Sequence, residues 1–448
     1  MSDGLTRRCR IGAMVVRAAN AAIHSCSRIL RPGDPVPLPG PVTHYDAFDT
    51  RKQKDTMITG SDASIGFVST FPPTVCGIAT YTASLVSALA GSSPRIRTGV
   101  VSLDNGSSRK GDSPVVMHHR TGDRTSLRTA TAILNTYDTV SIQHEYGIWG
   151  QRDGIEVLDL MSGLAVPAAV TLHTVLREPS HDQRAIIERL CGFAERVVVM
   201  SETASTRLVD CYDVDPSRIS VIAHGADPEF GGPSLVKGDR PLILTWGLIG
   251  PGKGLEWAIE GLANLVDMKP LPRYLIAGAT HPNVRQETGE TYRESLIALT
   301  EGLGLGPMVE FDDRYLDRRD LARLVRSADV VVLPYESVEQ VTSGVLVEAI
   351  AASKPVVATR FPHALELLSG GTGAVVPFGD PYRLGWELRR ILSDRPTHEL
   401  MTSRARQLAT DWYWPTVGHQ FAEMMSEMAA ATNTQYAIPA LDRRHATG

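Results

Sequence analysis

The strongest constraint on the fold is an alternation of short apolar segments with helical stretches, which begins at Ser64. Such alternation is typical of a parallel sheet that is covered by helices on both faces. The first series of predicted strands reads SIGFVST, RIRTGVVSL, DTVSIQHE, AAVTLHT, ERVVVMS and ISVIAHG. The second reads LILTWG, RYLIAGAT, MVEF, DVVVLPY, PVVATR and GAVVPF. The sequence therefore predicts an α/β protein with two doubly wound sheets in series.

The boundary between the two series falls near Gly231, at the polar, Gly/Pro-containing segment GGPSLVKGDRP. We expect one Rossmann-like domain over residues 61–232 and a second over 233–400. Helices are predicted for 401–432, packing back on the first domain, and a loose tail for 433–448. Such sheets bind ligands outside the carboxyl ends of their strands, so the two domains are expected to face each other across a cleft.

The N-terminal extension, residues 1–60, differs from the rest of the chain. Its first 31 residues hold six arginines against one acid, Asp3, and a Pro-rich stretch, RPGDPVPLPGP, overlaps their end. A signal peptide requires an uninterrupted apolar core, and here Arg17 and Asn20 interrupt it. We expect a disordered extension, or a working protein that begins at Met57. A basic amphipathic helix that touches anionic lipid is the alternative.

Net charge and cysteine usage argue against several functional classes. The formal charge of −5 lacks the basic footprint that nucleic-acid binding favours, so no nucleic-acid partner is expected. The five cysteines form no CxxC pair, which predicts reduced thiols rather than a zinc site or a disulfide framework. No apolar run approaches the roughly 20 residues of a membrane span. We therefore expect a cytoplasmic protein, with at most peripheral contact at the inner face of the membrane.

Two strand-to-helix loops of the second series have the composition of a phosphate site. In LTWGLIGPGKGLEWAIEGL, a Gly-rich loop with Lys253 precedes a helix, although the spacing is not that of a P-loop. A second helix is expected to begin around Ser343 and Gly344, where small residues would let an anion approach the helix N-terminus. Either loop could instead be only a turn.

Glu348 lies four residues after Gly344 and therefore on the same helix face, about 5 Å further along. A carboxylate can accept two hydrogen bonds from a vicinal diol such as a ribose, and ribose and phosphate are adjacent in a nucleotide. The segment therefore predicts a nucleotide site. In the alternative interpretation, Ser343 only caps the helix and Glu348 pairs with a basic side chain at the surface.

Candidate residues of the first series follow its strands. Gly77 stands at the entry of a helix, and His144 and His173 end two neighbouring predicted strands, both facing the predicted cleft. His224 is expected to shape the turn into the linker. The DVD sequence at 213–215 has the spelling of a metal-binding motif but precedes a Pro-Ser turn, so no metal is expected. GxSxG is absent, and no GxGxxG follows the first strand of either series, which disfavours hydrolase and NAD chemistry.

Taken in order, eight segments resemble the glycosyltransferases of family 4, retaining enzymes with the GT-B fold. The segments are FPPTVCGIATYTASL, HEYG, TLHT, VVVMSETAS, VIAHGAD, GLIGPGKGLE, ADVVVLPY and QVTSGVLVEAIAASKPVVAT. The resemblance covers about Ser64 to Met428, most of the chain. The resemblance implies transfer of a sugar from a nucleotide donor held mainly by the second domain to an acceptor held mainly by the first. No His/Cys/Asp cluster elsewhere in the sequence has metal-ligand spacing, so we expect neither a metal nor a cofactor.

Site residues can be carried over by the same resemblance. Gly77 matches the loop near the donor phosphates, and His173 matches the histidine beside the reacting sugar. Lys253 matches the phosphate-binding lysine. Glu348 matches the second acid of an E-x7-E motif, the one that binds the ribose. Gln340 stands where that motif has its first acid.

Three departures from the family pattern concern loop flexibility and charge. Cys76 stands where the loop often has a glycine, Leu248 where many members have an arginine, and Gln340 where an acid is usual. Gln340 keeps hydrogen-bonding capacity toward sugar hydroxyls without the negative charge. Because Leu248 replaces an arginine, Lys253 is expected to supply more of the positive charge at the phosphates.

The motifs QHEYGIWG, GATHP and GE.YR resemble a bacterial subgroup associated with mannosyl transfer. The expected donor is therefore GDP-mannose, with UDP-glucose as the other choice, and the acceptor is a carbohydrate or glycolipid hydroxyl. His144 and Glu145 are expected to line the acceptor side. Two alternatives remain open, a nucleotide-sugar epimerase and a non-catalytic nucleotide-sugar-binding protein.

Overall fold

The structure is a computed structural model, and it describes residues 63–93, 95–104, 114–233 and 238–436. The predicted N-terminal extension and residues 437–448 of the predicted tail lie outside the described residues. Within the described ranges, no helix combines the length and the apolar composition needed to cross a bilayer.

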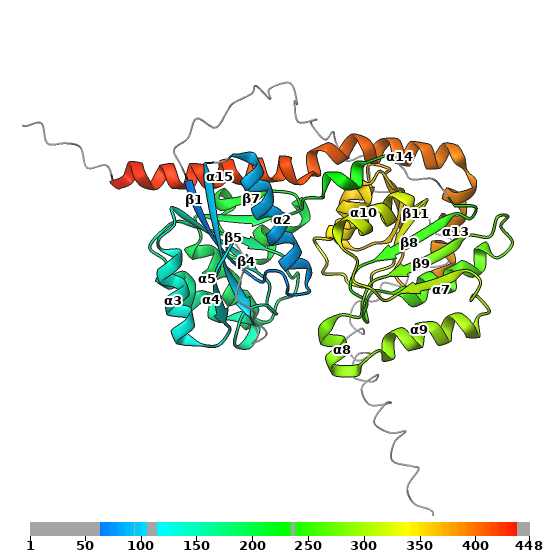
Figure 1. Cartoon of the computed structure of the whole chain (residues 1–448), viewed down its shortest axis with the longest axis horizontal. Helices are drawn as coiled ribbons and strands as arrows, with labels where there is room; N and C mark the ends of the chain where they lie inside the picture. Colours follow the sequence, from blue (N-terminus) through cyan, green and yellow to red (C-terminus); the bar gives the residue numbers. More distant parts are fainter. Residues whose placement is uncertain (1–62, 94, 105–113, 234–237, 437–448) are drawn as a thin grey trace, which may run out of the picture. The chain divides into compact units, whose positions relative to one another are not determined.

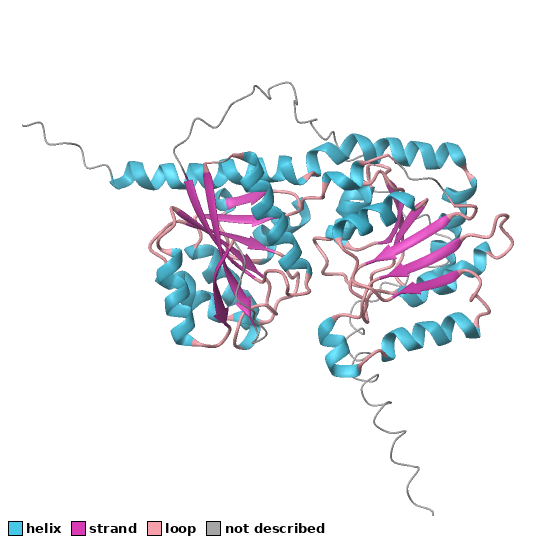
Figure 2. Cartoon of the chain, in the orientation of Figure 1, coloured by secondary structure: helices cyan, strands magenta, loops and turns pink. Residues whose placement is uncertain are grey.

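The first half of the chain forms a parallel sheet with the strand order β3-β2-β1-β4-β5-β6-β7 (Figures 1 and 2). Its strands are β1 (Ala63–Ser69), β2 (Ile96–Asp104), β3 (Val115–Arg120), β4 (Thr139–His144), β5 (Ala168–Leu172), β6 (Arg196–Val199) and β7 (Ile219–Val221). The helices between them are α2 (Gly77–Ser92), α3 (Arg124–Leu134), α4 (Glu156–Gly163), α5 (His181–Phe193) and α6 (Glu202–Cys211). Strands β4 and β5 are buried along their whole length, as expected of a sheet covered on both faces.

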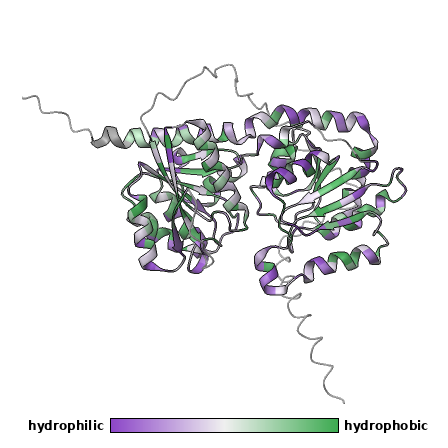
Figure 3. Ribbon diagram, in the orientation of Figure 1, coloured by the Kyte–Doolittle hydropathy of each residue, from purple (hydrophilic) through white to green (hydrophobic). Residues whose placement is uncertain are grey.

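The second half forms a parallel sheet with the order β10-β9-β8-β11-β12-β13. Its strands are β8 (Leu242–Trp246), β9 (Arg273–Ala277), β10 (Val309–Asp312), β11 (Val330–Leu333), β12 (Val356–Thr359) and β13 (Gly373–Val376). Its helices are α7 (Leu255–Gly261), α8 (Pro282–Thr288), α9 (Thr291–Gly302), α10 (Arg318–Ser327), α11 (Gly344–Ala351), α12 (Pro362–Leu368) and α13 (Pro381–Ser393). Figure 3 shows hydrophobic colouring along its strands, which form the core.

Each sheet reverses its strand order at one point. Strand β1 pairs with β2 on one side and β4 on the other, and β8 pairs in the same way with β9 and β11. Loops that leave such neighbouring strands on opposite faces open a crevice at the carboxyl ends of the strands. The loops after β1, β4, β8 and β11 are therefore the places where this fold would hold a ligand.

Two helices follow α13 and extend the second half back to the first. Helix α14 (Arg395–Ala409) contains position 400, the predicted domain boundary, and α15 (Trp414–Tyr436) follows it. The apolar face of α15, which includes Val417 and Phe421, shares a buried cluster with Phe67 of β1 and Leu85 of α2. The close approach requires Gly418, because a Cβ there would lie 2.7 Å from that of Ala88. The C-terminal helix is thus part of the first domain's core.

Polar contacts also join helix α6 of the first domain to the segment after β11 and to helix α12. The Ser201 hydroxyl donates to the Val341 carbonyl at 2.8 Å, and Arg207 forms an ion pair with Glu339 at 2.7 Å. The carboxylate of Glu366 accepts hydrogen bonds from the backbone amides of Glu202 and Thr203, each at 3.0 Å. Glu366 on α12 therefore caps the N-terminus of α6, where a negative charge is favourable.

We expect Glu366→Ala to lower the free energy of unfolding by about 1–2 kcal/mol, because it removes a charged cap from the N-terminus of α6. Urea unfolding of the variant and of wild type measures the change. Glu423→Ala on α15 is the control, since that side chain is about half exposed. An unchanged unfolding midpoint for Glu366→Ala would contradict the stabilising role of this contact.

Strand β3 was not among the predicted strands, whereas the other strands match the predicted segments. Its sequence, VVMHHR, ends in three polar or basic residues, and among the described strands it pairs only with β2. An edge strand with a polar end lacks the apolar run from which the other strands were predicted.

Candidate functional site

The loop between β8 and α7 contains Lys253, and the glycines on either side of this lysine both have positive φ. Gly252 and Gly254 have φ values of 83° and 62°, and a Cβ at Gly254 would collide with the Pro334 carbonyl. The ammonium nitrogen of Lys253 lies 4.4 Å from the centroid of the Tyr335 ring, which follows β11. Burial lowers the pKa of this amine. The two loops at the switch point of the second sheet thus meet at Lys253.

Helix α11 begins where the sequence predicted, and Ser343 is its N-cap. The Ser343 hydroxyl accepts a hydrogen bond from the Leu346 amide at 3.2 Å, and its own amide donates to His363 Nδ1 at 2.9 Å. The amides of Gly344 and Val345 have no partner among the described residues. Two backbone donors at the N-terminus of α11 are therefore available to an anion.

Gly344 is required by the packing of the first domain against α11. A Cβ at this position would lie 2.8 Å from Cε1 and Nε2 of His224, which follows β7. The Nδ1–H of His224 donates to the Gly225 carbonyl at 2.8 Å, and burial lowers the pKa of this imidazole to about 4. His224 was expected to shape a turn; the structure places it directly against the first residue of α11.

Glu348 is half-buried, one turn after Gly344, and its partner is an indole rather than a basic side chain. Trp246 at the end of β8 donates its Nε1–H to Glu348 Oε2 at 3.1 Å, and Oε1 has no partner among the described residues. Burial raises the pKa of this carboxyl to about 7, against the opposing effects of the indole hydrogen bond and of Arg318. In the alternative interpretation, Ser343 caps the helix and Glu348 pairs with a basic side chain. The cap is present, whereas no ion pair of Glu348 is found among the described residues.

Gln340 is half-buried, in the segment that precedes α11. Its carbonyl accepts a hydrogen bond from the His363 amide at 3.3 Å, and its side-chain amide has no partner among the described residues. The neighbouring acid, Glu339, is occupied by Arg207 and by the Arg177 amide at 2.8 Å. Glu339 thus makes a structural contact, whereas the side-chain amide of Gln340 is free.

The loop that follows β1 ends at Cys76, which is the N-cap of α2, and Gly77 is the first residue of that helix. Cys76 has extended backbone angles, which any residue can adopt, and its sulfur accepts a hydrogen bond from the Ala79 amide at 3.3 Å. Among the described residues, no atom lies within 4 Å of a Cβ placed on Gly77. Packing within this part of the chain therefore does not require glycine at position 77, and space is open beside it.

His173 lies next to His144, as the sequence predicted, because β5 pairs with β4 and the His173 amide donates to the His144 carbonyl at 3.0 Å. Its Nε2 contacts the side-chain oxygen of Gln143 at 2.9 Å, which places the ring proton on Nε2 and leaves Nδ1 as an acceptor. Burial, then the charges of His224 and His144, lower the pKa of His173 to about 3. This imidazole is neutral at physiological pH.

Tyr81 of α2 joins His173 to His224. Its ring centroid lies 4.9 Å from that of His173 and 5.2 Å from that of His224, and its hydroxyl is buried without a partner among the described residues. Sequence patterns did not single out Tyr81, because an aromatic residue on an apolar helix face is usual in a core. His224 did carry a signal, since it is a third histidine close to the end of a predicted strand segment, ISVIAHG.

His144 and Glu145 differ from what was expected of the acceptor side. His144 is fully buried, both ring nitrogens lack partners among the described residues, and burial lowers its pKa to about 4. Its imidazole therefore has no face open to solvent, although the sequence had placed it toward a cleft. Glu145 is half-buried and accepts a hydrogen bond from the Gly147 amide at 2.7 Å, so it closes its own turn.

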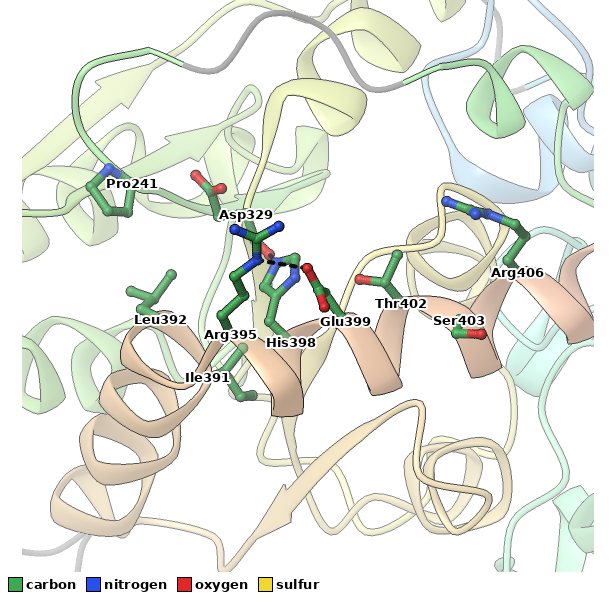
Figure 4. Close-up of a pocket in the computed structure, with 10 residues that line it drawn as sticks. All are labelled: Pro241, Asp329, Ile391, Leu392, Arg395, His398, Glu399, Thr402, Ser403 and Arg406. Carbon is green, nitrogen blue, oxygen red and sulfur yellow. Dashed lines mark hydrogen bonds and ion pairs between the residues drawn. The ribbon is translucent and has the colours of Figure 1, made fainter.

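A cavity of about 620 Å³ lies at the opposite end of the second sheet from these residues (Figure 4). It is lined by Pro241 and Asp329, which precede β8 and β11, and by the helix that carries Arg395, His398 and Arg406. An ion pair at 2.7 Å joins Arg395 to Glu399 in its wall. Parallel sheets bind ligands at the carboxyl ends of their strands, so this cavity is separate from the candidate site.

Two family models match the chain in succession. Residues 75–230 match the model described as Glycosyltransferase Family 4, and residues 228–408 match the model described as Glycosyl transferases group 1. The matches meet at the segment between β7 and β8 and together include nearly all of both sheets and most of α14.

The curated relatives include the D-inositol 3-phosphate glycosyltransferases of Corynebacterium glutamicum (strain R) and Corynebacterium efficiens. Both are 30% identical to this chain, over 275 and 276 residues. The alignments cover 57% and 56% of this chain and 63% and 61% of the relatives. The chain therefore spans less than two thirds of the length of these relatives.

Similar solved structures include the Anabaena protein HepE in complex with UDP, with a TM-score of 0.63 and 18% identity over 81% of this chain and all of that one. Sucrose-phosphate synthase from Thermosynechococcus elongatus has a TM-score of 0.66 and 19% identity, over 82% of this chain and all of that one. A candidate UDP-N-acetylglucosamine 2-epimerase from Listeria monocytogenes has a TM-score of 0.57 and 14% identity, over 83% of this chain and 98% of that one. These likenesses confirm the predicted fold of two parallel-sheet domains.

Proposed function

Because the chain belongs to the glycosyltransferases of family 4 and group 1, we propose that it moves a hexose from a nucleotide sugar to an acceptor hydroxyl with retained configuration. The observation that carries the proposal is the half-buried Glu348. Its carboxylate has one free oxygen and lies one turn below the free amides of Gly344 and Val345. A carboxylate beneath two anion-binding amides fits the ribose and the diphosphate of a nucleotide.

The proposed reaction breaks the bond between C1 of the donor sugar and the oxygen of the leaving diphosphate. The acceptor hydroxyl attacks C1 from the side of the leaving group, and the released diphosphate oxygen takes its proton. Negative charge develops on the diphosphate, where Lys253 and the amides of α11 would stabilise it. His173, neutral and with Nδ1 free to accept, would orient a hydroxyl of the sugar or of the acceptor.

We favour GDP-mannose as the donor, and the UDP and UDP-glucose bound to the Anabaena structures make UDP-glucose the second choice. The name of the Corynebacterium relatives adds an inositol phosphate to the carbohydrate and glycolipid acceptors worth testing. A glycolipid acceptor would bring a cytoplasmic protein into peripheral contact with the membrane. No metal is included in the proposal, so EDTA should leave the transfer rate unchanged.

The test is release of nucleoside diphosphate from the donor that most raises Tm in a panel of nucleotide sugars. Release only when an acceptor is present supports the transferase. Acceptor-independent release together with an altered sugar would favour the epimerase, and binding without turnover would favour a non-catalytic protein. Either of these two outcomes overturns the proposal.

Lys253→Met is expected to lower kcat/KM at least ten-fold, or about 1.4 kcal/mol of transition-state stabilisation. Methionine keeps an unbranched apolar stem next to Tyr335 and removes only the charge that faces the diphosphate. Steady-state kinetics with a fixed acceptor measures the effect. Lys269→Met, which lies on the segment before β9, is the matched control. Unchanged kinetics in the Lys253 variant would remove this residue from the site.

Gln340→Ala is expected to weaken binding of the intact nucleotide sugar several-fold while leaving the free nucleoside diphosphate nearly unaffected. The free side-chain amide of Gln340 is proposed to contact sugar hydroxyls, which the nucleoside diphosphate lacks. Isothermal titration calorimetry with both ligands separates the two effects. Equal losses for both ligands would place Gln340 at the nucleotide instead of the sugar.

A further inference from the structure

Two sequence motifs that the proposed function leaves unexplained, GATHP and GE.YR, lie next to the Lys253 loop. Strand β9 ends at Ala277, and the loop that follows it runs beside the loop that follows β8. The Ile249 amide donates to the Ala279 carbonyl at 2.9 Å, and the His281 amide donates to the Ile249 carbonyl at 2.8 Å. His281 of GATHP is therefore fixed against the loop that carries Lys253.

The side chain of His281 has a defined tautomer. It is the N-cap of α8, and its Nδ1 accepts a hydrogen bond from the Asn283 amide at 3.2 Å. The proton of the neutral ring is therefore on Nε2, which has no partner among the described residues. Burial, then the neighbouring charge of Lys253, lower the pKa of His281. A half-buried N–H donor thus lies on the loop that is paired with the Lys253 loop.

The GE.YR motif holds the segment just before His281 in place. Arg293 is buried, donates to the Gly278 carbonyl at 2.6 Å and pairs with Glu290 at 3.4 Å. Glu290 in turn accepts a hydrogen bond from the Thr280 hydroxyl and pairs with Arg285 at 3.5 Å. This network restrains Gly278 and Thr280 from two sides. A segment held this firmly presents His281 in one position.

We propose that His281 is a second phosphate-binding residue of the donor site, donating its Nε2–H to a phosphate oxygen of the nucleoside diphosphate beside Lys253. Between Gly247 and Gly254 the phosphate loop supplies one cation, Lys253, whereas a diphosphate carries more than one negative charge. A further donor from the paired loop would satisfy an oxygen that the lysine leaves free. This inference rests on the proposed function.

The test uses two variants that keep the helix cap. Asn and Asp cap helices well, so His281→Asn and His281→Asp keep an acceptor for the Asn283 amide and remove the Nε2–H. Calorimetry with UDP, GDP, uridine and guanosine should show at least ten-fold weaker diphosphate binding by the Asn variant and unchanged nucleoside binding. The Asp variant should bind the diphosphates more weakly still, because it adds a negative charge.

The control is His181→Asn, a change at an exposed histidine at the start of α5. Wild-type diphosphate affinity in His281→Asn would overturn the inference. Equal losses of diphosphate and nucleoside binding with a lower Tm would also overturn it, since His281 would then only support the fold. Equal affinities of the Asn and Asp variants would place His281 away from the phosphates. If wild-type protein binds none of the four ligands or their nucleotide sugars, the proposed function fails together with this inference.

Discussion

Replacing Glu348 with glutamine is expected to weaken nucleoside diphosphate binding roughly 10- to 150-fold at pH 8, which corresponds to about 1.5–3 kcal/mol for one charge-assisted hydrogen bond. Glutamine has nearly the same shape and keeps an oxygen that can accept the Trp246 indole N–H. It loses the negative charge that the ribose hydroxyls would contact. Calorimetry with UDP and GDP measures the change.

The same variant is expected to be more stable than wild type at pH 8, and this gain distinguishes a binding residue from a structural one. Burial raises the pKa of Glu348 from about 4.5 to about 7, so the folded protein binds the proton more tightly than the unfolded chain does. The free energy of unfolding therefore falls as the pH rises from about 4.5 to about 7, and above that range the buried charge destabilises the fold by its full amount. A neutral glutamine removes this destabilisation.

The Tm difference between Glu348→Gln and wild type should therefore grow between about pH 5 and pH 8. Glu387→Gln is the matched control, because that carboxylate is also partly buried in the second domain but pairs with Arg390 on α13. Wild-type diphosphate affinity in Glu348→Gln would show that the acid does not contact the nucleotide. A loss of stability at pH 8 would show that the carboxylate is needed by the fold.

The second large effect is expected at His173. His173→Ala should lower the transfer rate at least about 100-fold, in the range that a positioned hydrogen-bonding or proton-transferring side chain supplies, while donor affinity changes only a few-fold. The reason is location: His173 follows β5 of the first sheet, whereas the residues proposed to hold the nucleotide follow strands of the second. Single-turnover rates and calorimetric donor affinities, measured on the same preparation, separate the two quantities.

His173→Asn distinguishes positioning from loss of packing. Alanine also removes the edge contact with Tyr81, whereas asparagine keeps a polar side chain that can reach toward Gln143. We expect transfer to be low in both variants and Tm to be closer to wild type in His173→Asn. His419→Ala on the exposed face of α15 is the control for changing a histidine. A collapse of donor affinity in His173→Ala would mean that the first domain helps to hold the nucleotide.

Much of the fold could be predicted from local pattern. The strands other than β3 are apolar runs bounded by polar turns, and this property does not depend on distant parts of the chain. Because the carboxyl ends of parallel strands share one edge of a sheet, a correct list of strands also placed Lys253, Ser343 and His173 at edges where ligands bind. The helix spacing that put Glu348 below Gly344 is likewise local.

Contacts between distant segments were decided by the tertiary structure. Trp246 as the partner of Glu348, His224 against Gly344 and Tyr81 between two histidines each join residues more than 50 positions apart in the sequence. Periodicity reports which face of an element is apolar, but it does not report which other element covers that face. The same limit explains His144, whose place at the end of a strand suggested an open cleft and whose burial was set by its neighbours.

The sequence by itself thus determined the two wound sheets, the family and the loops at which a ligand would bind. The tertiary structure alone decided the state of the side chains in those loops and in the adjoining helix α11. It raised the pKa of Glu348 to about 7, lowered that of His173 to about 3 and fixed the tautomer of His281. The physical reason is that desolvation and hydrogen bonding depend on every atom packed around a group, and most of those atoms come from distant parts of the chain.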